Sequence, residues 1–268
     1  MALVTEVKPQ LVNCLKELHL PTFRQAYESV AKQAQQEALS YESYLLELAT
    51  RECQERRHKR IDRLLHESRL PLEKNLQTFD LKRLPGKVLQ QVRVLLEGSF
   101  VERRENVLAF GKPGSGKTHL LCAITQELVR TGRRALYSPC SLLVQELLLA
   151  KRELKLHRLL KRLAAYDILL LDDLGYVQQD REEMEVLFTL LAERYERGSV
   201  LLTSNLAFSG WENIFKDPMT TAAAIDRLVH HCVILELNVS SYRAEQAKKA
   251  KEARQTTDET KEQNPESK

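Results

Sequence analysis

The chain has few cysteines, and their arrangement excludes two kinds of site. Five cysteines stand among 268 residues, and no two of them form a Cys-x-x-Cys pair. An odd number of scattered cysteines argues against a disulfide framework and against a cysteine-based zinc site. We therefore expect reduced and mostly structural thiols at Cys14, Cys53, Cys122, Cys140 and Cys232.

Long hydrophobic runs are missing as well. The longest uninterrupted apolar run covers only residues 120–124, far short of the roughly 18 residues that a membrane span needs. The opening Met1-Ala2-Leu3-Val4 is followed by the acidic Glu6 and not by a signal-peptide pattern. We expect a protein that is neither exported nor held in a membrane.

An excess of charge of one sign is also missing. Lys and Arg number 41 against 37 Asp and Glu, which leaves a net charge of +4. Any attraction to nucleic acid must therefore come from local clusters of basic residues and not from the total charge.

The histidines offer no obvious metal site. The seven histidines include one adjacent pair, His230 and His231. Neighbours in a strand point to opposite faces of the sheet, and no Cys or Asp lies at ligand spacing from this pair. We expect no metal site built from protein side chains alone.

Hydrophobic periodicity divides the chain into three parts. Residues 1–70 carry apolar side chains at helical spacing, as at Leu11, Leu15 and Leu18, and Ser40 can cap a longer helix. Prolines and glycines then mark a boundary near residue 70. The second part, 71–242, holds the strand patterns. The third, 243–268, has no Leu, Ile, Val or aromatic residue, so we expect at most a frayed helix and then disorder.

The second part alternates helical patterns with short apolar runs. This alternation predicts an α/β fold with a parallel sheet that is covered by helices on both faces. Ligands bind such sheets at the carboxyl ends of the strands. The five predicted strands are residues 106–111, 134–139, 167–172, 199–204 and 231–237.

A phosphate-binding loop follows the first predicted strand. The stretch fits Gly-x-x-x-x-Gly-Lys-[Ser/Thr] in full and precedes a helical run, which argues against a chance glycine-rich turn. Its backbone N–H groups and the helix N-terminus face an anion, Lys117 supplies a charge to the β and γ phosphates, and Thr118 is placed for Mg²⁺. The loop consists of Gly111, Lys112, Pro113, Gly114, Ser115, Gly116, Lys117 and Thr118.

Polar residues end two further strands. Asp172 and Asp173 follow an apolar run about fifty residues after the loop, where a P-loop NTPase places its acidic pair. Asp172 would order Mg²⁺ through water and Asp173 would polarise the attacking water; the alternative is that both only cap the next helix. Asn205 ends another strand and would place an amide near the γ-phosphate, although a plain turn residue remains an alternative.

Several stretches beyond these motifs carry a family resemblance. They are residues 70–74 with Leu76, 79–80, 171–175, 203–206 with Trp211, 224–231 and 241–243. On these residues, the region from about 70 to 243 resembles the AAA+ ATPases of the DnaC/IstB group, and most closely the IstB transposition helpers, which are encoded beside the IstA transposase. The resemblance implies an AAA+ P-loop NTPase fold with five parallel strands, preceded by a small all-helical domain.

The resemblance also implies roles for single residues. Lys117 and Thr118 match the Walker A pair, Asp172 and Asp173 the Walker B pair, and Asn205 sensor 1. Arg227 stands where this group places an arginine finger, which completes a neighbouring subunit's site; a salt bridge near Asp226 is the alternative.

Two departures limit the match. Asp173 replaces the glutamate of the wider class, which favours slow hydrolysis. The chain after Asn205 is short, so the helical lid of larger AAA+ proteins is expected to be absent or vestigial, with Arg243 as a partial substitute for the sensor 2 arginine.

Two basic clusters are candidate DNA contacts. The first is predicted on one face of a helical stretch before the Asp172 strand, and the resemblance implies that it faces the channel of a ring or spiral. The second lies in the N-terminal helix among acidic residues, which equally suits intrahelical pairs or docking on another subunit. The candidates are Lys151, Arg152, Lys155 and Arg158, then Arg56, Arg57, Lys59 and Arg60.

Together these observations predict an ATP-dependent, DNA-binding ATPase of the bacterial cytoplasm and nucleoid. It would use ATP and Mg²⁺, assemble as a homo-oligomer on duplex DNA and deliver target DNA to an IstA-like transposase. A DnaC-like helicase loader is one alternative, and a structural DNA-binding module with nucleotide as an assembly clip is another. A metabolic P-loop kinase is the least favoured, because nothing after Asn205 resembles an acceptor pocket.

Overall fold

The computed structural model describes residues 2–174, 181–211 and 218–242. The predicted tail, with Arg243 and any lid, and Gly175 of the resemblance lie outside the described residues. The chain divides into two compact units, Met1–Arg63 and Leu64–Lys268. Within the described residues, no helix combines the length and the apolar character that crossing a membrane requires.

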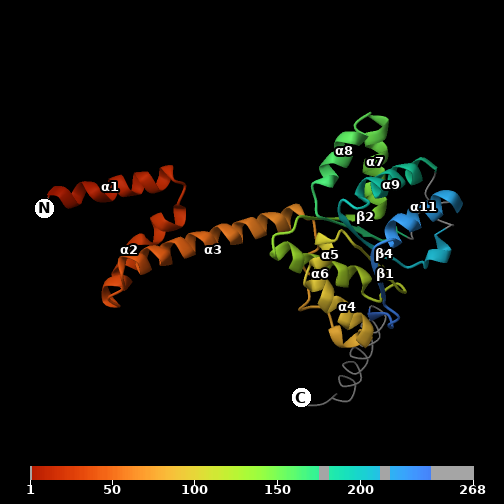
Figure 1. The fold of residues 1–268 in the computed structure, drawn as a ribbon, viewed down its shortest axis with the longest axis horizontal. Coiled ribbons are helices and arrows are strands. Elements are labelled where there is room, and N and C mark those ends of the chain that lie inside the picture. The colour runs from red at the N-terminus through yellow and green to blue at the C-terminus, as the bar shows by residue number, and fades with distance from the viewer. Residues whose placement is uncertain (1, 175–180, 212–217, 243–268) are drawn as a thin grey trace, which may run out of the picture. The chain divides into compact units, whose positions relative to one another are not determined.

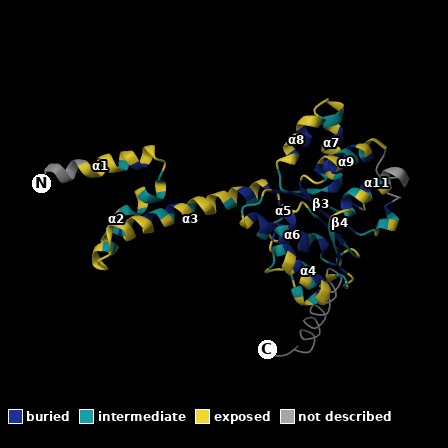
Figure 2. Cartoon of the chain, in the orientation of Figure 1, coloured by how far each residue is buried: buried dark blue, intermediate teal, exposed yellow. Residues whose placement is uncertain are grey.

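The N-terminal unit is built from helices only, as predicted. It contains α1 (Ala2–Glu17), α2 (Pro21–Gln36) and α3 (Tyr41–Glu67) up to Arg63. The predicted cap at Ser40 is present, because its Oγ accepts a hydrogen bond of 3.2 Å from the backbone N–H of Ser43. The unit buries few side chains, among them Leu15, Val30 and Leu48 (Figure 2).

The second unit is organised around one parallel sheet of five strands, which confirms the predicted fold class. The strands lie in the order β2-β3-β4-β1-β5, and Figure 1 labels β2, β4 and β1 of this sheet. All four neighbouring pairs are parallel. The strands are β1 (Asn106–Phe110), β2 (Ala135–Pro139), β3 (Ile168–Asp172), β4 (Ser199–Ser204) and β5 (Cys232–Glu236).

Alternating side chains of each strand enter two separate cores. In β1, Leu108 belongs to one core and Val107 and Ala109 to the other, as the two-residue period of a strand requires. The Leu108 core is covered by α7 (Cys140–Arg152), α8 (Leu156–Ala164), α9 (Arg181–Arg194) and α11 (Pro218–Val229). The opposite core is covered by the end of α3 and by α4 (Gly86–Leu96), α5 (Ser99–Glu102) and α6 (Lys117–Arg130).

The basic stretch before β3 is not one continuous helix, so the prediction of a single face for Lys151, Lys155 and Arg158 is wrong. Helix α7 ends at Arg152 and α8 begins at Leu156. Leu154 between them has a left-handed backbone (φ 59°). The N–H of Leu154 donates to Lys151 O at 3.0 Å and that of Lys155 to Ala150 O at 2.7 Å, the Schellman arrangement that ends helices. The stretch is therefore a helical hairpin with Leu154 at its tip.

Candidate nucleotide site

The phosphate-binding loop joins β1 to α6, as predicted, and its glycines are required by its shape. Gly114 and Gly116 have left-handed backbones, with φ of 81° and 95°. A Cβ at Gly114 would lie 2.2 Å from Ser241 Oγ, and one at Gly116 would lie 3.0 Å from the Phe79 ring. Larger residues would therefore both strain the backbone and collide with the wall of the site.

Two polar side chains of the loop are held inside it. Lys117 is 8% exposed, and its Nζ donates to the carbonyl oxygens of Gly111 at 2.7 Å and Lys112 at 3.1 Å. Ser115 Oγ is buried with no hydrogen-bond partner among the described residues. Such an orphaned donor is uncommon in a folded protein. A phosphate oxygen in the loop would satisfy it.

Asp172, at the end of β3, is oriented by hydroxyl groups from three other segments. Its Oδ1 accepts hydrogen bonds from Thr118 Oγ1 at 2.7 Å and Thr203 Oγ1 at 2.6 Å, and its Oδ2 accepts one from the Tyr137 hydroxyl at 3.1 Å. Burial, and then the charge of Asp172, raises the pKa of Tyr137 well above its usual range, so this phenol remains a donor.

The same carboxylate and hydroxyl oxygens fit a hard divalent cation. Mg²⁺ prefers oxygen ligands and is usually held through one or two protein oxygens, water and phosphate. Thr118 and Asp172 are the two residues that the sequence predicts to hold Mg²⁺, and Thr118 Oγ1 lies 2.7 Å from Asp172 Oδ1. Asp173 follows with a left-handed backbone (φ 68°), and its N–H donates to Thr203 Oγ1 at 2.8 Å. Thr203 therefore positions both acidic residues.

Asn205 lies after β4, the neighbour of β1, and faces a hollow beside the loop. It lines a volume of about 440 Å³ together with Gly111, Lys112 and Phe208. Its Oδ1 is buried and has no hydrogen-bond partner among the described residues. An amide in this position can contact a group bound at the end of the loop.

A second wall of the site comes from segments that the sequence motifs did not assign to it. A hollow of about 240 Å³ runs from the loop to Phe79, Arg83 and Tyr242. The Arg83 guanidinium lies 5.1 Å from the centre of the Tyr242 ring, and the N–H of Tyr242 donates to Gly114 O at 3.0 Å. Aromatic faces beside a phosphate loop suit a flat base. The only sequence signal was the resemblance in residues 79–80 and 241–243.

Arg227 does not join this site. It lies near the end of α11, and its carbonyl oxygen accepts a hydrogen bond of 3.4 Å from Asn106 Nδ2 at the start of β1. This is the amino edge of the sheet, about 16 Å from the carboxyl edge for strands of five residues. The Arg227 guanidinium donates to Ala223 O at 2.9 Å and stacks 4.7 Å from the Phe188 ring centre. Among the described residues it forms no ion pair with Asp226.

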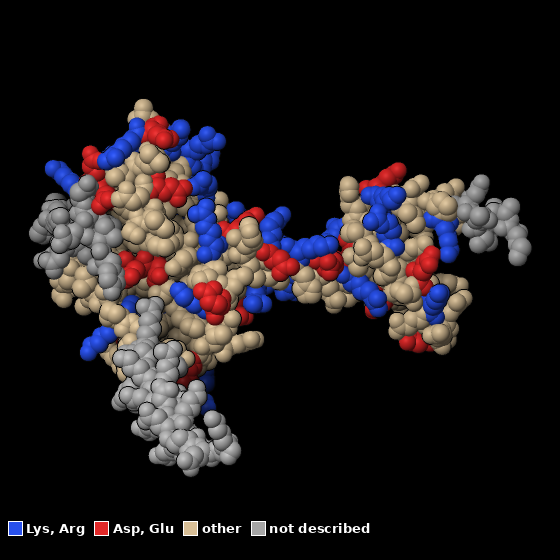
Figure 3. Space-filling view, turned by 180° about the vertical axis from the view of Figure 1, so that it is seen from behind, with Lys and Arg blue, Asp and Glu red and all other residues tan. Residues whose placement is uncertain are grey.

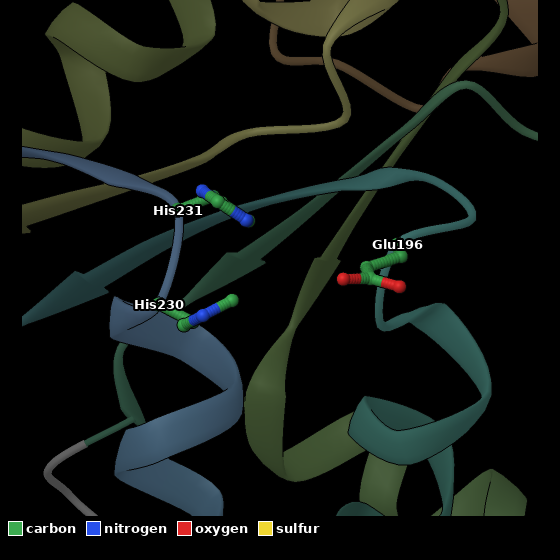
Figure 4. Close-up of side chains that lie close together, drawn as sticks. All are labelled: Glu196, His230 and His231. Atoms are coloured by element: carbon green, nitrogen blue, oxygen red, sulfur yellow. The ribbon is translucent and has the colours of Figure 1, made fainter.

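The prediction that His230 and His231 point to opposite faces is wrong. Both precede β5, in the turn after α11, so strand alternation does not apply to them. Their ring centres are 4.2 Å apart. Glu196 from the turn after α9 joins them (Figure 4), and the ligand atoms of the three side chains lie within 4.8 Å of one another.

The basic residues of the hairpin are largely paired. Lys151 lies 2.8 Å from Glu185, Arg152 3.4 Å from Glu182, and Lys155 2.8 Å from Glu153. Within the described residues, Arg158 has no ion pair. On the face drawn in Figure 3, basic side chains are mixed with acidic ones.

The N-terminal cluster is partly structural. Arg56 pairs with the buried Glu52 at 2.7 Å and also donates to His19 O at 2.6 Å. Lys59 pairs with Glu55 at 3.1 Å. Arg57 and Arg60 are exposed. Arg56 and Lys59 are exposed but engaged in these contacts, whereas the open pair, Arg57 and Arg60, forms no ion pair among the described residues.

Comparisons with known proteins identify an ATP-binding family. Residues 13–250 match the family model described as IstB-like ATP binding protein. The chain is 42% identical over 241 residues to an insertion sequence ATP-binding protein of Sinorhizobium fredii, covering 90% of this chain and 81% of that one. It is 39% identical to the IS21 ATP-binding protein of Pseudomonas aeruginosa, covering 83% and 84%.

Solved structures share the fold. A DnaC helicase loader has a TM-score of 0.50 at 21% identity, covering 63% of this chain and 97% of that one. DnaA from Aquifex aeolicus, bound to AMPPCP, has a TM-score of 0.53 at 20% identity, covering 63% and 51%. At this identity the likeness shows the AAA+ fold and nothing further.

Proposed function

The chain belongs to the IstB-like ATP binding protein family, and from this premise we propose that it is a DNA-binding ATPase that assembles on duplex DNA and delivers the target to a transposase. The relatives are named as ATP-binding proteins of insertion sequences. One observation carries the proposal: the proposed catalytic residues lie at opposite edges of the sheet. Lys117 and Asp172 lie at the carboxyl edge, and Arg227 lies at the amino edge.

The described side chains support hydrolysis of a bound triphosphate. Lys117 exchanges its two carbonyl contacts for oxygens of the β and γ phosphates. Thr118 and Asp172 would hold Mg²⁺, which when bound would neutralise charge on those phosphates. Asp173 accepts a proton from the attacking water, and the Asn205 amide contacts the γ-phosphate. The shorter arm of Asp173 than of glutamate leaves the base farther from the water, so slow turnover is expected.

Arg227 supplies its charge to another subunit. It cannot reach the phosphates of its own chain across about 16 Å of sheet. A second copy whose carboxyl edge faces this amino edge brings the two halves together. Such a head-to-tail contact is heterologous and generates a ring or a helical spiral. A permanently charged guanidinium suits the charge that develops on a transferring phosphoryl group.

The helical hairpin is the proposed DNA contact. Its ion pairs are exposed, and such pairs contribute only about 0 to 1 kcal/mol, so phosphates can replace the carboxylates. Leu154 at the tip is 94% exposed and stands between Arg152 and Lys155. An apolar tip flanked by cations is the arrangement with which proteins enter a DNA groove. The open pair on α3, Arg57 and Arg60, is a second contact.

The test measures the mass of the assembly by light scattering, with a duplex or the matching single strand, and with ATP, a non-hydrolysable analogue or no nucleotide. We expect large, defined assemblies only with nucleotide and duplex, and phosphate release that Asp173→Asn abolishes. Binding to single strands without assembly on duplex would instead support a helicase loader. Assembly without any phosphate release would support a structural module.

A matched set of variants tests the hairpin. Replacing Lys151, Lys155 and Arg158 together by Ala should weaken duplex binding and reduce its dependence on salt concentration. Replacing Arg130, an exposed arginine at the end of α6, should change neither the affinity for duplex DNA nor its dependence on salt concentration. An unchanged salt dependence in the triple variant would remove the hairpin from the DNA contact.

A further inference from the structure

A cluster of two histidines and a glutamate lies at the amino edge of the sheet, away from the nucleotide site. Glu196, His230 and His231 are all exposed, and their ligand atoms lie within 4.8 Å of one another. Figure 4 shows the three side chains converging from two turns, the one after α9 and the one after α11. Nothing in the proposed ATPase cycle uses them.

The backbone around the cluster is fixed by hydrogen bonds. The N–H of His230 donates to Asp226 O at 2.9 Å, and His231 O accepts from the N–H of Asn106 at 2.8 Å, which ties the pair to the first strand. Glu196 has a left-handed backbone (φ 56°), and its carbonyl oxygen accepts a hydrogen bond from Arg104. The two turns are therefore held in place, and the three side chains that they carry are exposed.

The separations suit a single metal ion. Imidazole nitrogens and carboxylate oxygens bind Zn²⁺ at about 2.0 to 2.2 Å, so two ligand atoms on one tetrahedral ion lie about 3.4 Å apart. The three ligand atoms lie within 4.8 Å of one another, so we expect rotation of these exposed side chains to bring them to that spacing.

One ring is already oriented by a neighbour. The Tyr195 hydroxyl lies 3.0 Å from His230 Nδ1. Histidines that bind metals almost always donate their other ring N–H to a second group, which fixes the tautomer and the ring orientation. With Nδ1 directed at Tyr195, Nε2 of His230 is left for a metal.

From this geometry we infer that Glu196, His230 and His231 form a binding site for a divalent transition metal of the Zn²⁺ class. Imidazole ligands select Zn²⁺, Cu²⁺ or Ni²⁺ and not Mg²⁺, which prefers oxygen. The site is therefore chemically distinct from the proposed Mg²⁺ position at Thr118 and Asp172, and it lies at the other edge of the sheet.

Positive groups beside the site have hydrogen-bond partners other than the three ligand side chains. Arg103, Arg104 and Arg227 line the same hollow as Glu196 and His231. Arg103 pairs with Glu105 at 2.7 Å, Arg104 bonds the Glu196 carbonyl, and Arg227 bonds Ala223 and stacks on Phe188. A bound ion would join the end of α9 to the end of α11, the two helices that carry Phe188 and Arg227.

The experiment is a calorimetric titration of the full chain, without a histidine tag, with Zn²⁺. The protein carries Cys14→Ser and Cys53→Ser, because these two exposed thiols are competing ligands. We expect one Zn²⁺ to bind per chain and to raise the melting temperature, and excess Mg²⁺ not to displace it. Glu196→Gln, His230→Ala and His231→Ala should each weaken binding about tenfold or more, and Tyr195→Phe about tenfold through loss of the supporting hydroxyl.

His157→Ala is the matched control, because this exposed histidine of α8 lies in the same unit outside the cluster. It should bind Zn²⁺ like the parent. The inference is overturned if the double variant His230→Ala/His231→Ala keeps the parent's affinity, or if His157→Ala loses as much as the cluster variants. No nucleotide or DNA enters the titration, so the result stands apart from the proposed ATPase function.

Discussion

At the level of single residues, Asp172 accepts hydrogen bonds from side chains of three other segments. The loop supplies Thr118, β4 supplies Thr203 and β2 supplies Tyr137, each through a hydroxyl hydrogen bond to the carboxylate. A carboxylate held by three donors presents its remaining lone pairs in fixed directions. Outer hydrogen bonds of this kind would orient the carboxylate toward Mg²⁺ when the ion is bound.

We predict that Tyr137→Phe lowers the affinity for ATP about tenfold in the presence of Mg²⁺, since outer hydrogen bonds to a metal-holding carboxylate contribute on that scale. Binding of a fluorescent ATP analogue with and without Mg²⁺ measures the change. Without Mg²⁺ the affinity should stay at the parent level, and Tyr166→Phe should change neither value. An equal loss in both conditions would mean that Tyr137 acts through the fold and not through Asp172.

The cysteines should differ widely in reactivity. Cys14 and Cys53 are exposed, whereas burial raises the pKa of both Cys122 and Cys140 to about 12. Because the thiolate is the reactive form, a thiol reagent at neutral pH should label the first two rapidly and leave the buried two intact until the protein unfolds. Mass spectrometry of the labelled peptides measures this. Fast labelling of Cys140 in the native protein would contradict the packing of α7.

At the level of elements, α2 and α3 are joined by a buried carboxylate. Glu52 is 4% exposed and accepts hydrogen bonds from the N–H of Thr22 at 2.9 Å and from Arg56 at 2.7 Å. Burial acts to raise the pKa of Glu52, but these hydrogen bonds outweigh it and the pKa lies below 4.5. A folded pKa below the unfolded one stabilises the unit above pH 4.5, and this contribution is lost as the pH falls through the folded value.

Glu52→Gln should therefore lower the free energy of unfolding of the N-terminal unit by about 1 to 3 kcal/mol at neutral pH, the range for hydrogen bonds to charged groups. The difference between the parent and the variant should shrink as the pH falls below 4.5. Urea titrations followed by far-UV circular dichroism measure it. A difference that stays constant down to strongly acid pH would exclude the ionised carboxylate as its source.

The tip of the α7–α8 hairpin combines two unfavourable features. Leu154 is 94% exposed and has a left-handed backbone, which costs a residue other than glycine about 1 to 2 kcal/mol. Leu154→Gly should raise the free energy of unfolding by about 1 kcal/mol and weaken duplex binding. Ala38, also left-handed, gives the matched variant Ala38→Gly, which should stabilise without affecting DNA. Unchanged duplex affinity in Leu154→Gly would exclude the tip from the DNA contact.

The strands and the phosphate loop could be predicted because their signals are local. Each strand is an apolar run between turn residues, and the loop is one continuous motif. The break at Leu154 could not, because residues 150–155 contain no Gly or Pro and the packing of α8 against α7 decides the turn. The second wall of the site could not be predicted because it depends on contacts between residues far apart in the sequence. Arg83, for example, donates a hydrogen bond to Ser240, 157 positions away. The histidine cluster depended on where α11 ends, which the sequence did not define.

For the whole molecule, the separation of Arg227 from the loop makes a quantitative prediction. Asp173→Asn removes the proposed base but leaves the proposed catalytic arginine, and Arg227→Ala does the reverse, so each variant alone should hydrolyse almost no ATP. In an equal mixture, an active interface needs an intact nucleotide site from one subunit and an intact arginine from its neighbour. For random head-to-tail assembly, about a quarter of the interfaces meet both conditions, so turnover should recover to about a quarter of the parent rate.

Phosphate release from the mixture on duplex DNA measures this recovery. Lys117→Ala with Asp173→Asn is the matched control, because both changes affect the same half of the interface and their mixture should stay inactive. If Arg227 acted within its own chain, neither mixture would recover any activity, although both would still assemble. Recovery in the first mixture alone requires that every working site be built from two copies of the chain, because the sheet itself keeps the arginine and the phosphate loop of one copy apart.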